Sequence, residues 1–220
     1  MSPSSPVVIP AILAKSKAEF LQKITLLGRA EEMIHVDVMD GQFVKQKTWA
    51  KAKAIAALRT RAAFELHLMV NDPLSVMIDW MKVPGFRRAI VHVESPVQIA
   101  TVIKEARLRC IEIGLAISPG TPLSALTPFL KKIDMVQVMG GVPGKSGQPL
   151  DSNTLDTVRA IHKKAPHLPI AFDIGVNRHT IPTLVHTGVT RLCAASAIFS
   201  VKNPARERAT LQRIALQASK

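Results

Sequence analysis

Tyrosine is absent from this sequence of 220 residues, which has only seven phenylalanines and two tryptophans. Proteins that bind single-stranded nucleic acid stack the bases on aromatic side chains, and such a platform has little to be built from here. Acidic residues are also scarce, with 16 Asp and Glu against 29 Lys and Arg, for a formal net charge of +13. The basic residues are spread along the chain, so we interpret them as a solvated basic exterior.

Cysteine is nearly missing as well. Only Cys110 and Cys193 occur, and neither lies in a C-x-x-C pattern, which argues against a disulfide framework or a cysteine zinc site. No apolar stretch approaches the ~20 residues that a bilayer-spanning helix needs. The start, "MSPSSPVVIPAIL", lacks the basic region of a signal peptide. We therefore expect a cytoplasmic protein with no membrane partner.

What the sequence does contain is a regular alternation. Apolar runs suited to buried strands span residues 7–13, 33–39, 63–70, 89–94, 111–117, 135–139, 169–174 and 190–195. Segments of helical periodicity follow them at 17–27, 48–60, 72–81, 95–108, 121–132, 151–165, 178–188 and 204–218. Eight units of roughly 27 residues predict an α/β fold of the (β/α)8 TIM-barrel type. An open doubly wound sheet is the alternative, but the lack of a G-x-G-x-x-G motif favours closure. We expect one domain over residues 1–220, with 1–6 as a loose leader.

Four polar residues stand near the ends of these strands. His35 and Asp37 share one face of the second strand by its period of two, together with Met39. His67 lies on the third strand and Asp173 at the end of the seventh. The carboxyl ends of barrel strands are where TIM-barrel chemistry takes place. Two imidazoles and two carboxylates there form a set suited to Zn²⁺, or to another divalent ion such as Fe, Mn or Co.

A plainer interpretation competes with the metal site. A lone strand histidine is commonly a hydrogen-bonded core residue, and an aspartate at a strand end often caps the next helix. We keep that interpretation for His92 and Glu94 in "IVHVES", as hydrogen-bonded support residues. The four residues above are harder to explain by packing, because all of them would point into one space.

Six motifs then connect the sequence to a known family. They are "HVDVMDGQFV", "LHLMV", "GLAISPGTPL", "MGGVPGKSGQ", "FDIGV" and "ASAIF". Their order and spacing resemble those of ribulose-phosphate 3-epimerases, and the likeness runs from "IPAIL" to "SAIF". The resemblance implies a barrel of the ribulose-phosphate-binding type. It also implies an isomerase of the pentose phosphate pathway, which inverts carbon 3 of D-ribulose 5-phosphate to give D-xylulose 5-phosphate.

The resemblance further implies roles for individual residues. A divalent metal would be held by His35, Asp37, His67 and Asp173, and the two aspartates would also serve as acid and base. Methionines at positions 39, 69 and 139 (Met39, Met69 and Met139) would pack around the reacting carbons. The chemistry is consistent with these residue types, because a proton must leave one face of carbon 3 and return to the other through an enediolate. A metal would stabilise the charge that develops on the substrate oxygens.

Three positions depart from the family pattern. Ala11 stands where the family usually has Ser, Ile174 replaces a glycine of a D-G-G, and Ala195 replaces the glycine of a G-S. A β-branched residue cannot adopt a positive φ without strain. Side chains of Lys145 and Ser146 are new polar neighbours that could compensate. The residues expected around the phosphate are Gly144, Lys145, Ser146, Gly147, Ile174, Gly175, Ala195 and Ser196.

These departures leave alternatives to a ribulose-phosphate epimerase. The enzyme could epimerise another ketose phosphate, such as a hexulose 6-phosphate, or the barrel could bind a phosphometabolite without catalysis. A third hypothesis, nucleic-acid binding through the basic surface, predicts an affinity that falls steeply with salt. We expect a small phosphosugar as the partner, no nucleic acid, and a homo-oligomer.

Overall fold

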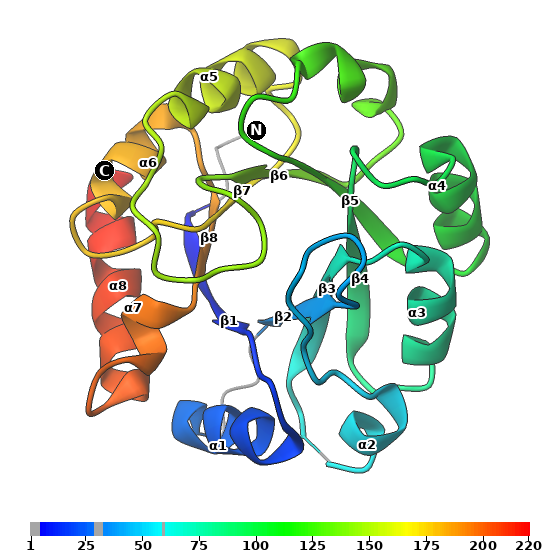
Figure 1. Ribbon diagram of the computed structural model, residues 1–220. Helices are drawn as coiled ribbons and strands as arrows, with labels where there is room; N and C mark the ends of the chain where they lie inside the picture. Colours follow the sequence, from blue (N-terminus) through cyan, green and yellow to red (C-terminus); the bar gives the residue numbers. More distant parts are fainter. Residues whose placement is uncertain (1–4, 29–32, 59) are drawn as a thin grey trace.

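The computed structural model describes residues 5–28, 33–58 and 60–220. Eight parallel strands close into a barrel in the order β1 to β8 (Figure 1). Their bounds are β1 Val7–Ile12, β2 Met33–Met39, β3 Ala63–Met69, β4 Phe86–His92, β5 Glu112–Ile117, β6 Met135–Met139, β7 Ile170–Asp173 and β8 Arg191–Ala194. Because β8 pairs with β1, with Val7 opposite Arg191, the sheet has no open edge. The predicted (β/α)8 barrel is confirmed, and the open doubly wound alternative is wrong.

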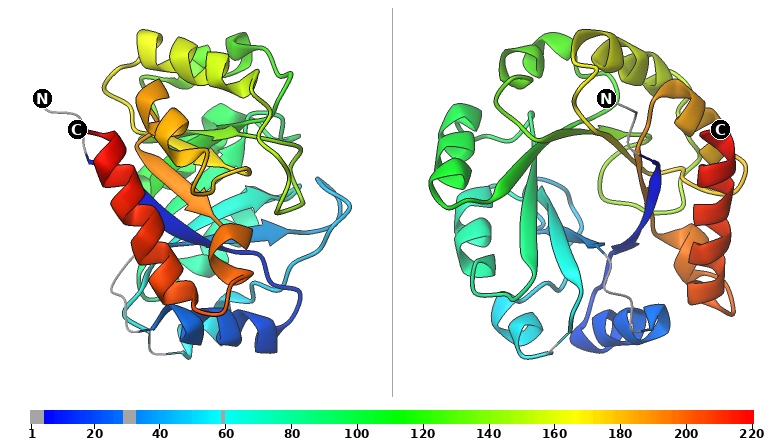
Figure 2. Two further views of the ribbon diagram at one scale, coloured as in Figure 1. Left: turned by 90° about the vertical axis from the view of Figure 1, so that its left-hand side faces the viewer. Right: turned by 180° about the vertical axis from the view of Figure 1, so that it is seen from behind.

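Helices surround the barrel on all sides (Figure 2). They are α1 Lys17–Leu27, α2 Ala52–Ala56, α3 Pro73–Trp80, α4 Ile99–Leu108, α5 Thr154–Lys164, α6 Ile181–Thr187, α7 Ser196–Phe199 and α8 Pro204–Ala218, with 3₁₀ turns η1 Leu123–Ala125 and η2 Thr127–Phe129. In the part of the chain that the structure describes, no helix combines the length and apolar character needed to cross a membrane.

Two of the predicted helices differ most from the periodicity of the sequence, and the short α7 was not predicted. The helix predicted at 121–132 is replaced by η1 and η2, because Pro128 has no N–H to donate and its ring obstructs a continuous α-helix. The helix predicted at 48–60 begins only at Ala52 and ends at Ala56. Thr48 Oγ1 donates to the Asp37 carbonyl at 2.8 Å and the Trp49 N–H donates to the Ala14 carbonyl at 2.7 Å. These bonds hold residues 48 and 49 against the strand ends and out of a helix. Residue 59 of that prediction lies outside the described residues.

The ends of the chain are joined through α8. Gln212 Oε1 accepts the Val8 N–H at 2.8 Å, and its Nε2 donates to the Pro6 carbonyl at 2.8 Å. Helix α8 therefore lies along β1 (Figure 2). Of the expected leader, residues 1–4 lie outside the described residues.

Strand parity separates two layers of side chains, as predicted. On β2, Ile34, Val36 and Val38 face outward and join the core beneath the helices, while the alternate residues face inward. The register places His35 beside Glu65 and Asp37 beside His67. Lower in the barrel, the small apolar cluster of Ile90, Ala116, Met135 and Ala171 fills the interior. Asp37, His67 and Asp173 lie toward the carboxyl ends of their strands, whereas a second inward polar group, Glu65 with Arg88 and Arg191, lies toward the amino ends.

Candidate metal centre

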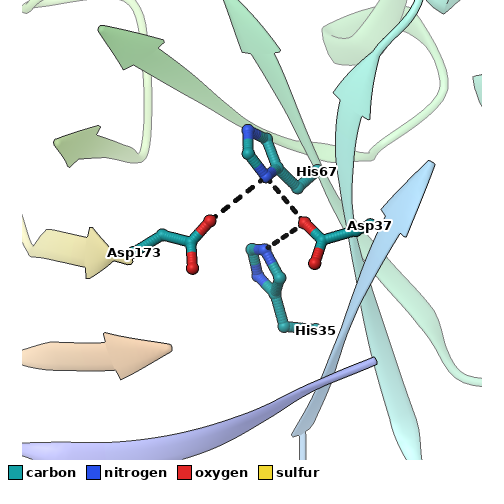
Figure 3. A group of neighbouring side chains, drawn as sticks. All are labelled: His35, Asp37, His67 and Asp173. Carbon is teal, nitrogen blue, oxygen red and sulfur yellow. Dashed lines mark hydrogen bonds and ion pairs between the residues drawn. The ribbon is translucent and has the colours of Figure 1, made fainter. Parts of the chain in front are cut away.

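Four side chains from three strands converge inside the barrel mouth (Figure 3). His35 and Asp37 come from β2, His67 from β3 and Asp173 from β7, and one candidate ligand atom of each lies within 4.8 Å of the others. His67 Nδ1 is 2.9 Å from Asp37 Oδ1 and 3.5 Å from Asp173 Oδ2. His35 Nε2 is 3.6 Å from the same Asp37 oxygen. The structure thus brings together the four ligands that the sequence predicted.

The arrangement fits a divalent cation on its own chemistry. His35 Nε2 is buried and makes no hydrogen bond to any residue that the structure describes. Two ligands of a tetrahedral ion, each about 2.1 Å from it, lie roughly 3.4 Å apart. The separations of 2.9, 3.5 and 3.6 Å are close to that value. A pair of imidazoles and a pair of carboxylates suit Zn²⁺ and other borderline ions.

Glu65 fixes the orientation of His35. Its Oε1 lies 2.9 Å from His35 Nδ1, and its Oε2 accepts from Arg88 Nη1 at 2.7 Å and from Arg191 Nη2 at 3.0 Å. Burial tends to raise the pKa of Glu65, but the hydrogen bond with His35 and the charges of Arg191 and Arg88 lower it to about 2. With Glu65 accepting from His35 Nδ1–H, a cation bound by His35 would take the Nε2 lone pair, which points toward the cluster. Glu65 shares the inward face of β3 with His67, which is two residues further along the strand.

The two aspartates differ in their affinity for a proton. Burial tends to raise the pKa of both carboxyls. In Asp37 the neighbouring imidazoles of His35 and His67 outweigh burial and lower the pKa. In Asp173 the negative charge of Asp37 adds to burial, and the pKa is raised. Carboxyl pairs whose pKa values are pushed apart are typical of acid–base catalysis.

The predicted substrate residues line a single cavity with both aspartates. The cavity wall includes Met39, Met69 and Met139, and the loop residues Gly144, Lys145, Ser146, Gly147, Ile174, Gly175, Ala195 and Ser196. The three methionines are buried. His35 and His67 are fully buried and form no part of this wall, so they support the aspartates from inside the barrel.

The turn after β7 has the conformation that its sequence makes difficult. Ile174 has φ +73° and Gly175 has φ +77°. The Ile174 N–H donates to Asp173 Oδ1 at 2.9 Å, which ties the strained residue to the candidate ligand. The β-branched side chain therefore does not prevent the left-handed turn, and the strain inferred from the sequence is present.

Three cavity residues were missed in the sequence: Leu13, Val176 and Cys193. Cys193 Sγ lies 3.6 Å from His35 Nδ1, and burial raises the pKa of the thiol to about 11, so it is neutral. The sequence offered one signal for Cys193. It lies on β8 two residues before Ala195, so the period of two places both residues on the same face.

Comparison with known proteins agrees with this geometry. Residues 7–199 match the model of the "Ribulose-phosphate 3 epimerase family". The chain belongs to this family. A ribulose-phosphate 3-epimerase of Schizosaccharomyces pombe is 31% identical over 202 residues, which cover 90% of this chain and 88% of the relative. The Mycobacterium tuberculosis (H37Rv) enzyme is 31% identical over 223 residues, 99% of this chain and 96% of the relative. The chain is thus an isomerase of the epimerase type.

Two further similarities concern location and fold. A rice (Oryza sativa subsp. japonica) relative, named as the cytoplasmic isoform, is 29% identical over 213 residues, 94% of this chain and 92% of the relative. Among solved structures, KGPDC from Streptococcus mutans superposes with a TM-score of 0.75 at 13% identity, covering 99% of this chain and 100% of the other. 3-Hexulose-6-phosphate synthase from Salmonella typhimurium gives 0.71 at 16% identity, covering 96% and 99%. At these identities the structures support the barrel fold alone.

Proposed function

We propose that this member of the family interconverts D-ribulose 5-phosphate and D-xylulose 5-phosphate by inverting carbon 3. One observation supports this most directly. Asp37 and Asp173 line one cavity, and the glycine-containing loops after β6 and β7 line the same cavity, together with Ala195 and Ser196 after β8. Such loops expose backbone N–H groups to which a phosphate can bind.

The two carboxylates suit an inversion because they approach from different strands. Asp37 projects from β2 and Asp173 from β7, toward each other (Figure 3). In the forward direction the ionised Asp37 removes the proton from one face of carbon 3. Asp173, in its protonated form, delivers a proton to the opposite face of the enediolate. In the reverse direction the roles are exchanged.

The residues around the two aspartates would bind a cation and exclude water. When bound by His35, Asp37, His67 and Asp173, a divalent cation, for which Zn²⁺ is our first choice, would supply positive charge opposite the enediolate oxygens. The three buried methionines exclude water and keep the local dielectric low, which strengthens interactions with that charge.

The phosphate would lie against the loop after β6. Gln148 Nε2 donates to the carbonyls of Val142 and Lys145, at 2.8 Å each, and so closes this loop on itself. Lys145 and Ser146 are exposed and line the cavity. We propose that their side chains bind the phosphate together with the backbone of Gly147, Gly175 and Ser196.

The test is an epimerisation assay on D-ribulose 5-phosphate, with and without chelator, followed by return of single divalent ions. We expect chelation to abolish turnover and Zn²⁺ or a similar ion to restore it. Asp37→Asn and Asp173→Asn should each lower kcat by about 10²–10⁴-fold. Asp72→Asn is the matched control, because Asn can still cap α3 as Asp72 does. Near-normal turnover in either of the first two variants would contradict the two-base mechanism.

A second measurement examines the direction of proton transfer. In D₂O, xylulose 5-phosphate formed at low conversion should carry deuterium at carbon 3, because the proton returned comes from the other carboxyl group. Full retention of the substrate proton would indicate transfer by one group alone.

An epimerase for another ketose phosphate is the second candidate. It is favoured by the altered phosphate end, where Ile174 and Ala195 replace the glycines expected there. Comparing kcat/KM for ribulose 5-phosphate and a hexulose 6-phosphate would discriminate between the two. Binding of both without turnover would support a catalytically silent barrel. We also propose a cytoplasmic location, as in the name of the rice relative, and a homo-oligomer, which sedimentation would test.

A further inference from the structure

His67 is bonded on the side that faces away from the candidate metal. Its Nε2 lies 2.8 Å from Nε2 of His92, the last residue of β4. His92 Nδ1 in turn lies 3.0 Å from Glu94 Oε2. The other Glu94 oxygen, Oε1, accepts the Ser118 N–H at 2.8 Å. A continuous hydrogen-bonded chain therefore runs from Ser118 through Glu94 and His92 to His67.

The proton positions in this chain follow from the partners. Two nitrogens 2.8 Å apart must share one proton. Glu94 Oε1 accepts the Ser118 N–H, and Glu94 Oε2 lies 3.0 Å from His92 Nδ1, where it can accept from an Nδ1–H. His92 is fully buried between His67 and the ring of Phe43, whose centroid is 4.9 Å away. For His67 to bind a cation through Nδ1, its ring proton must lie on Nε2, where His92 Nε2 accepts it and the His92 proton is left on Nδ1 toward Glu94.

This arrangement of protons leaves the His67 lone pair on Nδ1. With its proton on Nε2, His67 presents an unprotonated Nδ1 to Asp37 Oδ1 at 2.9 Å and Asp173 Oδ2 at 3.5 Å. The Asp37 carboxylate opposes this tautomer of His67, because it would attract a proton to the same Nδ1. A cation could then bind only by displacing that proton.

We propose that Glu94 and His92 are positioning residues that hold His67 in the tautomer able to bind the metal. The proposal rests on the metal site of the proposed function. It gives the two metal-binding imidazoles matching support, since Glu65 bonds His35 directly whereas Glu94 acts on His67 through His92. Outer partners of this kind typically change metal affinity by 10–100-fold when they are removed.

Zn²⁺ binding to the metal-free protein, by competition with a chromophoric chelator, tests the proposal without reference to turnover. His92→Leu removes the acceptor for His67 Nε2–H and should weaken the Zn²⁺ Kd by about 10–100-fold. His92→Gln places a carbonyl oxygen within reach of the same proton and should restore the Kd to within about threefold of wild type. Ser118→Ala is the control, because it removes only a 3.4 Å contact of its hydroxyl with His92 Nδ1 and leaves the Glu94 bond intact.

The outcomes separate the two proposals. Unchanged Zn²⁺ affinity in His92→Leu, with binding in the wild type, would overturn the positioning role and leave the proposed function standing. Equal weakening in the Leu and Gln variants would also overturn it, because packing alone would then explain the loss. If the wild type binds no divalent cation, the metal site and this inference fail together. In the Zn²⁺-loaded wild type, ¹H–¹⁵N spectra should show His92 protonated on Nδ1, and protonation on Nε2 would contradict the proposal.

Discussion

At the scale of single residues, Ile174 shows how a cavity wall can retain a costly conformation. Its φ of +73° is one that costs an L residue about 1–2 kcal/mol. The side chain is buried, the N–H is bonded to Asp173, and a Cβ on Gly140 would lie 2.4 Å from the Ile174 carbonyl oxygen. The surrounding contacts hold the backbone in place despite the strain.

Because of this strain, we expect the usual order of stability, in which an Ala variant is more stable than a Gly variant, to be reversed at Ile174. Ile174→Ala and Ile174→Gly lose similar burial, but only Gly relieves the left-handed backbone. We expect the Gly variant to have the larger free energy of unfolding, by about 1 kcal/mol, in urea titrations. At Val189, which is buried and has no positive φ, the Ala variant should instead be the more stable. The usual order at Ile174 would show that its backbone is not left-handed in solution.

Lys145 is the residue through which the altered phosphate end can be examined. If its ammonium group binds the phosphate, Lys145→Ala should raise KM about tenfold and leave kcat little changed. Competitive inhibition by inorganic phosphate should weaken in parallel. The matched control is Lys202→Ala, an exposed lysine that does not line the cavity. An unchanged KM would assign the phosphate to backbone groups alone.

At the scale of elements, periodicity and parity gave most of the barrel. Helices α1 and α8 match their predicted bounds, and His35 and Asp37 face inward as the period of two requires. The short α2 was not predictable, because hydrogen bonds from residues distant in sequence displace its first turns. The hydrogen bond between His92 and His67 was not predictable either. The residue pattern within one strand does not show how β3 and β4 lie side by side, and the bond depends on that arrangement.

Helix α8 supports β1 through one side chain. Gln212 satisfies the Val8 N–H and the Pro6 carbonyl, and both would lose their partner in Gln212→Leu. We expect this variant to lose about 1–3 kcal/mol of unfolding free energy, measured by urea denaturation. Gln217→Leu on the same helix, at an exposed position, should change stability by less than about 0.5 kcal/mol. Equal effects of the two variants would mean that the Gln212 bonds contribute nothing.

At the scale of the whole molecule, Glu65 joins four strands. It lies on β3 and bonds His35 on β2, Arg88 on β4 and Arg191 on β8. Its pKa is about 2 in the folded protein, against an ordinary value of 4.5. Since the unfolded chain binds the proton more tightly, the stability from this carboxylate is complete above pH 4.5 and is lost as the pH falls toward 2.

Glu65→Gln should therefore change both stability and its pH dependence. At pH 7 we expect a loss of about 3–5 kcal/mol in unfolding free energy, because buried charges lose their partner. Between pH 4.5 and 2 the stability of the wild type should decline more steeply than that of the variant. Denaturant titrations across this range, in the presence of chelator, provide the measurement. Parallel pH profiles would show that Glu65 is not the group that titrates.

The pairing of β1 with β8 has a consequence for synthesis on the ribosome. The β1 edge finds its partner only when residues 191–194 have left the exit tunnel, so the growing chain carries an unpaired strand edge until then. All four candidate ligands, the last of them Asp173, emerge before that partner does. Nascent chains stalled after β7 would thus carry every ligand on an unclosed sheet. Loss of protease resistance in such chains would measure how much the closing strand contributes to the order of the site.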